Sequence, residues 1–262
     1  MQIKMNLFFN IIQSSKDKQK RFDMFCKFRG FDLYANKNEV NFNGKNSKRI
    51  KEILEKEVLY AAEFYKFNDI LDCAFGVDDS INLDNKSNKE KLGIIYSKKT
   101  KKYICSVSRC YDENDIEEHL MWTHYANNHY GVRIDFELDT NKIPEAEYFI
   151  DDVKYIDGFK FLDIHRRNSN DINRILMYKH KIWEYENEYR IIVDDKKYRK
   201  IPIIIKRVVI GRGFYKNKTL ETNTGKSIIY SIADQLKSFL KDKPVKIYYY
   251  ESRYSDKIIE LL

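Results

Sequence analysis

Two glutamates and an arginine at alternating positions are the first residues in this sequence whose spacing predicts chemistry. Residues 183–193 read WEYENEYRIIV, so that single residues separate Glu186, Glu188 and Arg190. Side chains of a β-strand alternate between two faces, so we expect a strand that presents all three on one face. The carboxylates would lie about 7 Å apart, where each raises the other's pKa and the arginine lowers both. Such a group can hold a sugar hydroxyl or stabilise a developing positive charge. The plainer interpretation is a solvated strand face with one Glu–Arg ion pair.

The composition predicts a folded domain that positions these residues. Of the 262 residues, 43% are hydrophobic, and 20 Tyr and 16 Phe supply ample material for a core. This length fits one large domain or two small ones. The formal net charge of +8 fits a nucleic-acid partner or an acidic ligand. An AT-rich coding sequence, which favours lysine and asparagine, is a second explanation of that charge.

The distribution of residue types predicts one domain preceded by a short arm. We expect residues 1–21 to form an N-terminal arm or helix, residues 22–262 to form a single α+β domain, and residues 77–92 to be a flexible insertion. No apolar run reaches the length of a membrane span, and no cleavage site of small residues follows the short apolar start. We therefore expect a cytoplasmic protein with no membrane partner.

Cysteine and histidine spacings predict no metal site. The cysteines form no C-x-x-C pair, and their neighbours are apolar, so buried and reduced thiols are expected. His124 and His129 are five residues apart, whereas a helical metal-binding pair is four apart.

Periodicity predicts strands that alternate with a few helices. We expect one or two packed, mainly antiparallel sheets with flanking helices. Ser47 is expected to cap a helix, and Arg29 is expected on the first strand. The predicted strands cover residues 22–31, 102–108, 132–136, 153–155, 185–193, 201–210 and 245–250, and the predicted helices cover 47–58, 111–126, 171–182 and 231–239.

Four motifs, in this order along residues 22–250, resemble a bacterial family of domains of unknown function. They are Lys27-Phe28-Arg29; Phe67-Asn68-Asp69 followed by Asp72-Cys73; Met121-Trp122-Thr123-His124-Tyr125-Ala126 with His129 and Gly131-Val132; and Lys181 and Trp183 followed by Tyr185-Glu186-Asn187-Glu188-Tyr189-Arg190. Ile70 stands where that family usually has a proline.

The arrangement of these motifs also resembles the ADP-ribosyltransferase fold. In that superfamily a first-strand Arg or His binds NAD, a second strand offers Ser-x-Ser/Thr or a Tyr, and a late strand carries Glu/Gln-x-Glu. The resemblance implies that Arg29 binds NAD and that Glu186 and Glu188 are catalytic. It further implies an NAD-binding set that comprises Ser106, Ser108, Trp122, His124, Tyr125 and Arg190. Trp122 is equally suited to a core position, and the two serines to ordinary strand positions.

NAD would serve as a substrate in this chemistry. Cleavage of the nicotinamide–ribose bond passes through an oxocarbenium-like state that a carboxylate stabilises, as in glycoside cleavage. Arg29 would pair with the pyrophosphate, and an aromatic ring would stack on a base. We expect Glu188 to contact the ribose and Glu186 to activate the acceptor.

The predicted biological role is that of a bacterial toxin or anti-phage effector that modifies RNA or protein. An antitoxin or a chaperone would be a fitting partner. Two other classes stay open. One is a metal-dependent nuclease that uses Asp69, Asp72 and the two glutamates with Lys181, and the basic charge suits it. The other is a non-catalytic ligand-binding or interaction module.

Overall fold

The computed structural model describes residues 24–34, 39–69, 71–111, 116–144, 147–162, 164, 170–215 and 224–261. The expected N-terminal arm, residues 1–21, lies outside these ranges. The helices are α2 (Lys45–Lys56), α3 (Lys86–Thr100), α4 (Ile116–Tyr125), α5 (Asn170–Ile175) and α6 (Thr224–Leu240). The strands are β1 (Phe25–Gly30), β2 (Val58–Tyr60), β3 (Ala62–Glu63), β4 (Phe75–Val77), β5 (Tyr103–Arg109), β6 (Gly131–Leu138), β7 (Tyr148–Asp152), β8 (Lys154–Ile156), β9 (Lys160–Leu162), β10 (Tyr178–His180), β11 (Glu188–Val193), β12 (Lys200–Ile210), β13 (Lys246–Tyr250) and β14 (Ile258–Glu260).

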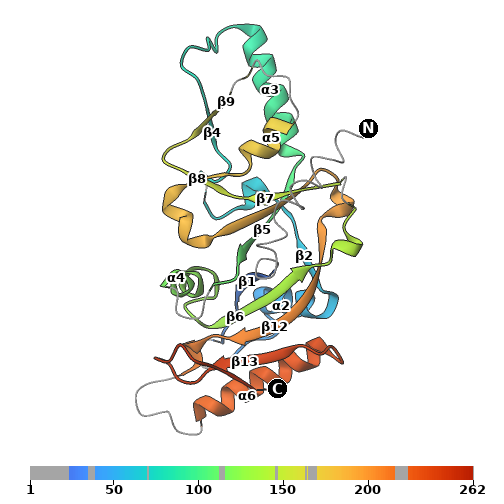
Figure 1. Cartoon of the computed structure of the whole chain (residues 1–262), viewed down its shortest axis with the longest axis vertical. Coiled ribbons are helices and arrows are strands. Elements are labelled where there is room, and N and C mark those ends of the chain that lie inside the picture. Colours follow the sequence, from blue (N-terminus) through green and yellow to red (C-terminus); the bar gives the residue numbers. More distant parts are fainter. Residues whose placement is uncertain are drawn as a thin grey trace, which may run out of the picture.

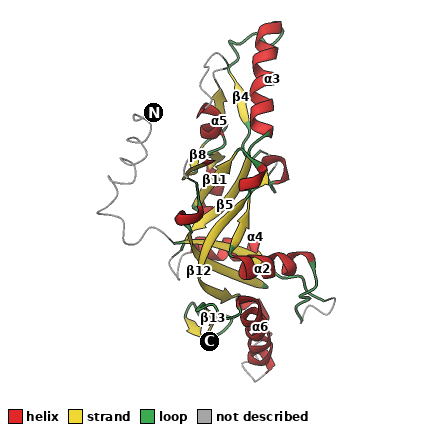
Figure 2. Cartoon of the chain, turned by 90° about the vertical axis from the view of Figure 1, so that its right-hand side faces the viewer, coloured by secondary structure: helices red, strands yellow, loops and turns green. Residues whose placement is uncertain are grey.

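One large, mainly antiparallel sheet organises the chain, as the α+β prediction requires. Its strand order is β14-β13-β12-β6-β1-β5-β11-β7, with β2 paired to β12 and β3 paired to β5 (Figure 1). Within it, β12 and β13 run parallel. Two small parallel pairs, β10–β8 and β4–β9, lie outside this sheet. Figures 1 and 2 place β4, β9, α3 and α5 at one end of the molecule and β13 with α6 at the other.

Hydrophobic side chains cover both faces of the sheet. On one face, Ile50 and Leu54 of α2 and Leu236 of α6 pack against alternate residues of β6 and β12. On the other face, Met121 and Trp122 of α4 pack against Cys26, Phe28 and Val209. The strands predicted for residues 22–31 and 201–210 are therefore present as β1 and β12.

The edge of β5 that faces β1 is only partly paired. Strand β1 pairs with β5 at Phe25–Arg109 and Cys26–Ser108, whereas β3 pairs with the other end of β5 at Ala62–Ile104 and Glu63–Tyr103. Between these two contacts, the backbone carbonyl of Ser106 accepts a hydrogen bond from Lys27 Nζ. A side chain thus takes the place of a strand, and β1 diverges from β5 beyond Cys26.

Several predicted elements differ from the observed ones. Glu186 ends a 3₁₀ helix, η4 (Lys181–Glu186), and Asn187 has a φ of 43°, so the strand begins at Glu188 and not at Tyr185. The helix predicted for residues 171–182 ends at Ile175, and β10 follows it. Ser47 lies inside α2 instead of capping it, because the Asp32 carboxylate accepts the first-turn N–H groups.

Residues 77–92, expected to be a flexible insertion, contain the end of β4 and the beginning of α3. The side chain of Asn85 accepts hydrogen bonds from the N–H groups of Ser87 and Asn88 and so caps this helix. In the part of the chain that the structure describes, no helix combines the length and the apolar character that crossing a bilayer requires.

Candidate functional site

A pocket of about 780 Å³ opens at the C-terminal end of β1, between the beginning of α2 and the end of α4. This volume lies within the range of small-molecule and cofactor sites. The polar residues of its lining include Arg29, Asp32, Tyr34, Asn46, Arg49, Asn68, His124, Tyr125, Asn127 and Asn128. Apart from Asp32, these residues are cationic or neutral.

Two arginines leave this pocket positively charged. Among the described residues, no carboxylate lies within 4.0 Å of the guanidinium of Arg29 or Arg49. The Nε atom of Arg29 is buried and has no hydrogen-bond partner there. Asp32, an acidic residue in the lining, is already engaged, since its Oδ2 accepts from the N–H groups of Asn46 and Ser47 at 2.6 and 3.0 Å. The pocket therefore favours an anionic ligand.

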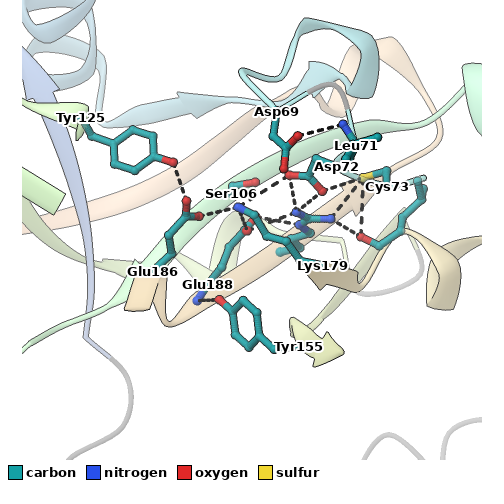
Figure 3. Close-up of polar contacts among 12 residues, drawn as sticks. Asp69, Leu71, Asp72, Cys73, Ser106, Tyr125, Tyr155, Lys179, Glu186 and Glu188 are labelled. Atoms are coloured by element: carbon teal, nitrogen blue, oxygen red, sulfur yellow. Dashed lines mark hydrogen bonds and ion pairs between the residues drawn. The ribbon is translucent and has the colours of Figure 1, made fainter. Parts of the chain in front are cut away.

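A cluster of five ionisable side chains, which we call the buried ion cluster, contacts Tyr125 of this pocket, as Figure 3 shows for the Glu186 carboxylate. It consists of Asp72, Lys179, Glu186, Glu188 and Arg190, each less than 9% exposed. Charged groups at this depth persist only when they are paired and hydrogen-bonded. Strand β11 and the η4 helix supply the glutamates and the arginine, β10 supplies the lysine, and the turn before β4 supplies Asp72.

Both carboxylate oxygens of Glu188 are engaged inside the buried ion cluster. Its Oε1 lies 2.7 Å from Arg190 Nε, and its Oε2 lies 2.9 Å from Lys179 Nζ. Burial alone would raise the pKa of Glu188, but Arg190 and Lys179 together with the Ser106 hydroxyl hold it well below its usual range. Glu188 is therefore ionised and 3% exposed, without direct access to the pocket.

The guanidinium of Arg190 is also buried, and its hydrogen bonds go to other buried groups. Its Nη2 lies 2.7 and 2.8 Å from the two carboxylate oxygens of Asp72, and its Nη1 donates to the backbone carbonyl of Leu176. It is 0% exposed and is not among the residues that line the pocket, so it orients Glu188 instead of reaching a ligand.

Glu186 connects the buried ion cluster to the pocket. Its Oε2 accepts a hydrogen bond from Lys179, and its Oε1 accepts one from the Tyr125 hydroxyl at 2.5 Å. Tyr125 lines the pocket. Burial raises the pKa of Glu186, and Lys179 offsets that rise only in part. Burial and the neighbouring Glu186 also raise the pKa of Tyr125, so its hydroxyl remains a hydrogen-bond donor.

Among the described residues, no ion pair joins Arg29 to either glutamate, and Lys27 interacts with Arg29 and with both glutamates. Strand register places Glu188, Ser108 and Cys26 on one face of the sheet, so Arg29 projects from the opposite face of β1. Lys27 lies between them. Burial and then Arg29 lower the pKa of Lys27 to about 8, and Glu188 and Glu186 oppose that shift. The Lys27 ammonium group therefore interacts electrostatically with Arg29 and with both glutamates.

The predicted serine pair lies on β5 between the other two strands. Ser106 is paired with Arg190 and Ser108 with Glu188 across the β5–β11 ladder. Ser106 hydrogen-bonds the Glu188 carboxylate, whereas Ser108 is buried and hydrogen-bonds the Tyr111 hydroxyl. Neither serine is among the pocket-lining residues.

Trp122 belongs to the core. It is 0% exposed, and its Nε1–H donates to Glu118 at 2.9 Å and to the Tyr250 hydroxyl at 3.0 Å. Arg133 pairs with the same Glu118 carboxylate. The pocket is reached instead by the residues that follow on α4, His124 and Tyr125. His124 Nδ1 lies 2.8 Å from the Tyr185 hydroxyl.

A left-handed turn forms one wall of the pocket. Asn127, Asn128 and His129 have φ values of 50°, 54° and 68°, a conformation that costs about 1–2 kcal/mol per residue outside glycine. Backbone packing holds it in place: a Cβ at Gly211 would lie 2.2 Å from the carbonyl oxygen of His129. Strain of this kind recurs at ligand-binding sites.

Lys179 and Arg49 were not singled out from the sequence, and Asp72 was named there only in a motif and in the nuclease alternative. Lys179 precedes Glu186 by seven residues across the change from β10 to the η4 helix, so no periodicity connects them. Arg49 belongs to an exposed helix face. The signal for Asp72 was its place in the motif series.

The alternative prediction of a nuclease required the carboxylates of Asp69, Asp72, Glu186 and Glu188 to lie together. Three of them, Asp72, Glu186 and Glu188, belong to the buried ion cluster. Their oxygens are, however, occupied by Lys179, Arg190 and Tyr125. Among the described residues, the group that has metal-ligand spacing is a different one, Cys26, Cys110 and Asp135. Asp135 is already paired with Arg133 and Arg207 there.

Comparison with known proteins gives one family match. A family model described as a protein of unknown function (DUF2971) matches residues 121–191, about a quarter of the chain. The match contains the segment from Met121 to Val132 and the segment from Lys181 to Arg190, and the motifs at Lys27 and Phe67 lie outside it. No curated protein and no solved structure matches the chain. Over residues 121–191 the chain is therefore similar to a family of domains of unknown function, in agreement with that part of the sequence prediction.

Proposed function

We propose that this protein is an NAD-dependent ADP-ribosyltransferase with the fold of that superfamily. The resemblance seen in the sequence requires an early strand with an arginine, a middle strand with Ser-x-Ser and a late strand with Glu-x-Glu, of which Glu188 begins the late strand and Glu186 ends the preceding η4 helix. These segments are β1, β5 and β11, which are consecutive neighbours in the sheet. Their adjacency across more than 150 residues of sequence supports the proposal, because no local pattern forces it.

The unpaired charges of Arg29 and Arg49 are the single observation that carries the proposal. NAD has a pyrophosphate between two nucleosides, and guanidinium groups bind phosphate oxygens through paired N–H donors. Tyr34, which is 48% exposed and lines the same pocket, offers a ring for stacking on a base. Asn68 and Asn127 add donors and acceptors around the two arginines.

We assign the reacting end of the site to Tyr125 and Glu186. The sequence-based expectation gave the ribose contact to Glu188 and acceptor activation to Glu186. Glu186 accepts a hydrogen bond from Tyr125, which lines the pocket, whereas the partners of the Glu188 carboxylate, Lys179 and Arg190, do not line it. This favours a different division, in which Glu186 acts on substrate and Glu188 positions Lys179 and Arg190. Burial raises the pKa of Glu186, which makes its carboxylate a better proton acceptor than an ordinary glutamate.

The proposed step breaks the bond between ribose C1′ and the nicotinamide nitrogen. The bonding electron pair leaves with nicotinamide, whose positive charge it neutralises, and C1′ becomes oxocarbenium-like. An oxygen or nitrogen of the acceptor then bonds to C1′, and the acceptor's proton passes to Glu186. The ionised cluster behind Tyr125 supplies negative potential for the cationic ribose.

The biological role that fits this activity is a toxin or anti-phage effector with RNA or protein as the acceptor, restrained by an antitoxin or chaperone. Incubation of the protein with NAD labelled in the adenylate moiety, together with total RNA or total protein, tests the activity and identifies the acceptor. Label retained on either fraction, with stoichiometric nicotinamide release, supports the proposal. Calorimetry that detects no NAD or ADP-ribose binding contradicts it, and binding without turnover indicates a ligand-sensing module.

A further inference from the structure

Unsatisfied polar atoms gather around the left-handed turn formed by Asn127, Asn128 and His129. Four buried side-chain nitrogen or oxygen atoms lack a hydrogen-bond partner among the described residues, and three of them are Arg29 Nε, His129 Nδ1 and Arg212 Nε. Buried polar atoms are almost always paired, so unpaired ones indicate a missing water, ion or ligand. Arg29 belongs to the pocket, whereas His129 and Arg212 are not among the residues that line it. They require a separate explanation.

Arg212 is fixed in a rigid setting beside this turn. It is 8% exposed, its guanidinium lies 4.0 Å from the centre of the Tyr250 ring, and its Nη2 lies 3.0 Å from Asp256 Oδ1. The adjacent residue, Gly213, donates its N–H to the carbonyl of His129 at 3.1 Å. The side chain therefore cannot swing away to satisfy its Nε–H group elsewhere.

The surroundings of Arg212 are rich in positive charge. His129 stacks on Trp122, with ring centroids 5.8 Å apart, and the ring centroid of His119 lies 6.1 Å from that of His129. Burial, and then the charges of Arg212, His119 and Arg253, lower the pKa of His129 to about 4. Asp256 is the acidic partner of both Arg212 and His119, at 3.0 and 3.6 Å, and its side chain is 42% exposed.

We propose that Arg212 and His129, with His119, form a phosphate-binding subsite separate from the pocket that Arg29 lines. The Arg212 Nε–H group and the His129 ring N–H, in its Nδ1–H tautomer, are the donors, and the phosphate oxygens are the acceptors. Asp256 competes with the phosphate for Arg212 and His119. The phosphate belongs either to a nucleic-acid backbone or to a small phosphorylated molecule. This inference does not depend on the proposed NAD chemistry.

Two-dimensional ¹⁵N spectra of the arginine Nε–H groups of the full chain test the proposal directly. Arg212→Lys identifies the Arg212 signal by its disappearance. Titration with inorganic phosphate is expected to shift that signal and the His129 ring signals to saturation. Asp256→Asn is expected to tighten phosphate binding about two- to fivefold by removing the competing carboxylate. Asp242→Asn, an exposed change of the same charge on the loop after α6, is expected to leave it unchanged.

A second titration with a single-stranded RNA oligonucleotide distinguishes the two sources of phosphate. If RNA shifts the Arg212 and His129 signals at far lower concentration than inorganic phosphate, the subsite serves a nucleic acid. If RNA gives no gain in affinity, it serves a small phosphorylated ligand. An Arg212 signal that neither titrant moves overturns the proposal, as do equal gains from Asp256→Asn and Asp242→Asn. Should Arg212→Lys fail to fold, the His129 ring signals of the unmodified protein provide the same readout.

Discussion

The hydroxyl of Tyr125 lies 2.5 Å from Oε1 of Glu186 and joins an open, cationic pocket to a buried cluster of paired charges. On the pocket side, Arg29 and Arg49 have no acidic partner among the described residues. On the cluster side, Lys179 holds Glu186 and Glu188 together. This hydrogen bond connects the pocket to the buried ion cluster. The negative charge of the cluster can therefore act on a ligand in the pocket through the Tyr125 hydroxyl.

Tyr125→Phe removes this hydrogen bond and keeps the ring. We expect kcat for nicotinamide release to fall about tenfold or more, since a hydrogen bond to a charged group contributes about 1.5–3 kcal/mol, while KM for NAD stays close to its original value. Thermal unfolding checks that the fold is intact. A variant with unchanged kcat would show that Tyr125 only lines the pocket.

Arg49→Ala tests whether the pocket binds an anionic ligand. Arg49 is exposed on α2 and lines the pocket, and we expect the variant to bind NAD about ten- to hundredfold more weakly. Lys51→Ala is the matched control, because Lys51 is an exposed cation on the same helix that pairs with Glu55 and does not line the pocket. Equal losses of affinity in the two variants, measured by calorimetry, would indicate a non-specific charge effect.

Glu188→Gln tests the buried ion cluster. Lys179 and Arg190 would lose a buried counter-charge, so we expect the free energy of unfolding to fall by about 3–5 kcal/mol. Glu137→Gln breaks an exposed pair with Lys206 at 2.8 Å and is expected to cost less than about 1 kcal/mol. Urea unfolding measures both changes. Similar losses would mean that Glu188 stabilises the fold no more than an exposed ion pair does.

The same glutamate predicts a dependence of stability on acid. The pKa of Glu188 is lower in the folded chain than in the unfolded chain, so its stabilising effect is complete above the unfolded pKa of about 4.3. It is lost progressively as the pH falls toward the folded value. The difference in unfolding free energy between the original protein and Glu188→Gln should therefore shrink below about pH 4.3. A constant difference across that range would refute the assigned shift.

Gly211→Ala tests the packing that holds the left-handed turn. The new Cβ would lie 2.2 Å from the carbonyl oxygen of His129, and because backbone must move, we expect a loss of about 1–3 kcal/mol. Gly93→Ala is a control that is expected to raise the free energy of unfolding instead of lowering it. It lies within α3 with no atom within 4 Å of the new Cβ, so helix propensity predicts a gain of about 0.5–1 kcal/mol.

Alternation and helical periodicity predicted the elements that form the core. Strand β12 and helix α6 cover the predicted ranges 201–210 and 231–239, and they bury Ile205, Ile232 and Leu236. Glu186 was misplaced because Asn187 adopts a left-handed conformation, and a regular alternation of residue types contains no sign of such a break. The alternating pattern of Glu186 and Glu188 nevertheless indicated two carboxylates in one cluster, which Lys179 assembles by a different geometry.

The pocket could be predicted only in part. Arg29, His124 and Tyr125 were selected from motifs and do line it. Arg49 was not selected, because an arginine on a basic, amphipathic helix has the signature of a solvated face. The turn at Asn127 was not foreseen either, because its left-handed conformation depends on tertiary contacts with Gly30, Gly211 and Gly213. These contacts join segments that lie far apart in the sequence.

The most direct test of the central claim is the rate of nicotinamide release from NAD by the original protein and by Glu186→Gln. Glu184→Gln, an exposed change on the same η4 helix, is the matched control. We predict release by the original protein and the control, and a loss of about 100-fold or more in Glu186→Gln. Equal rates in all three proteins, or no release by the original protein in the presence of either acceptor fraction, would contradict the account.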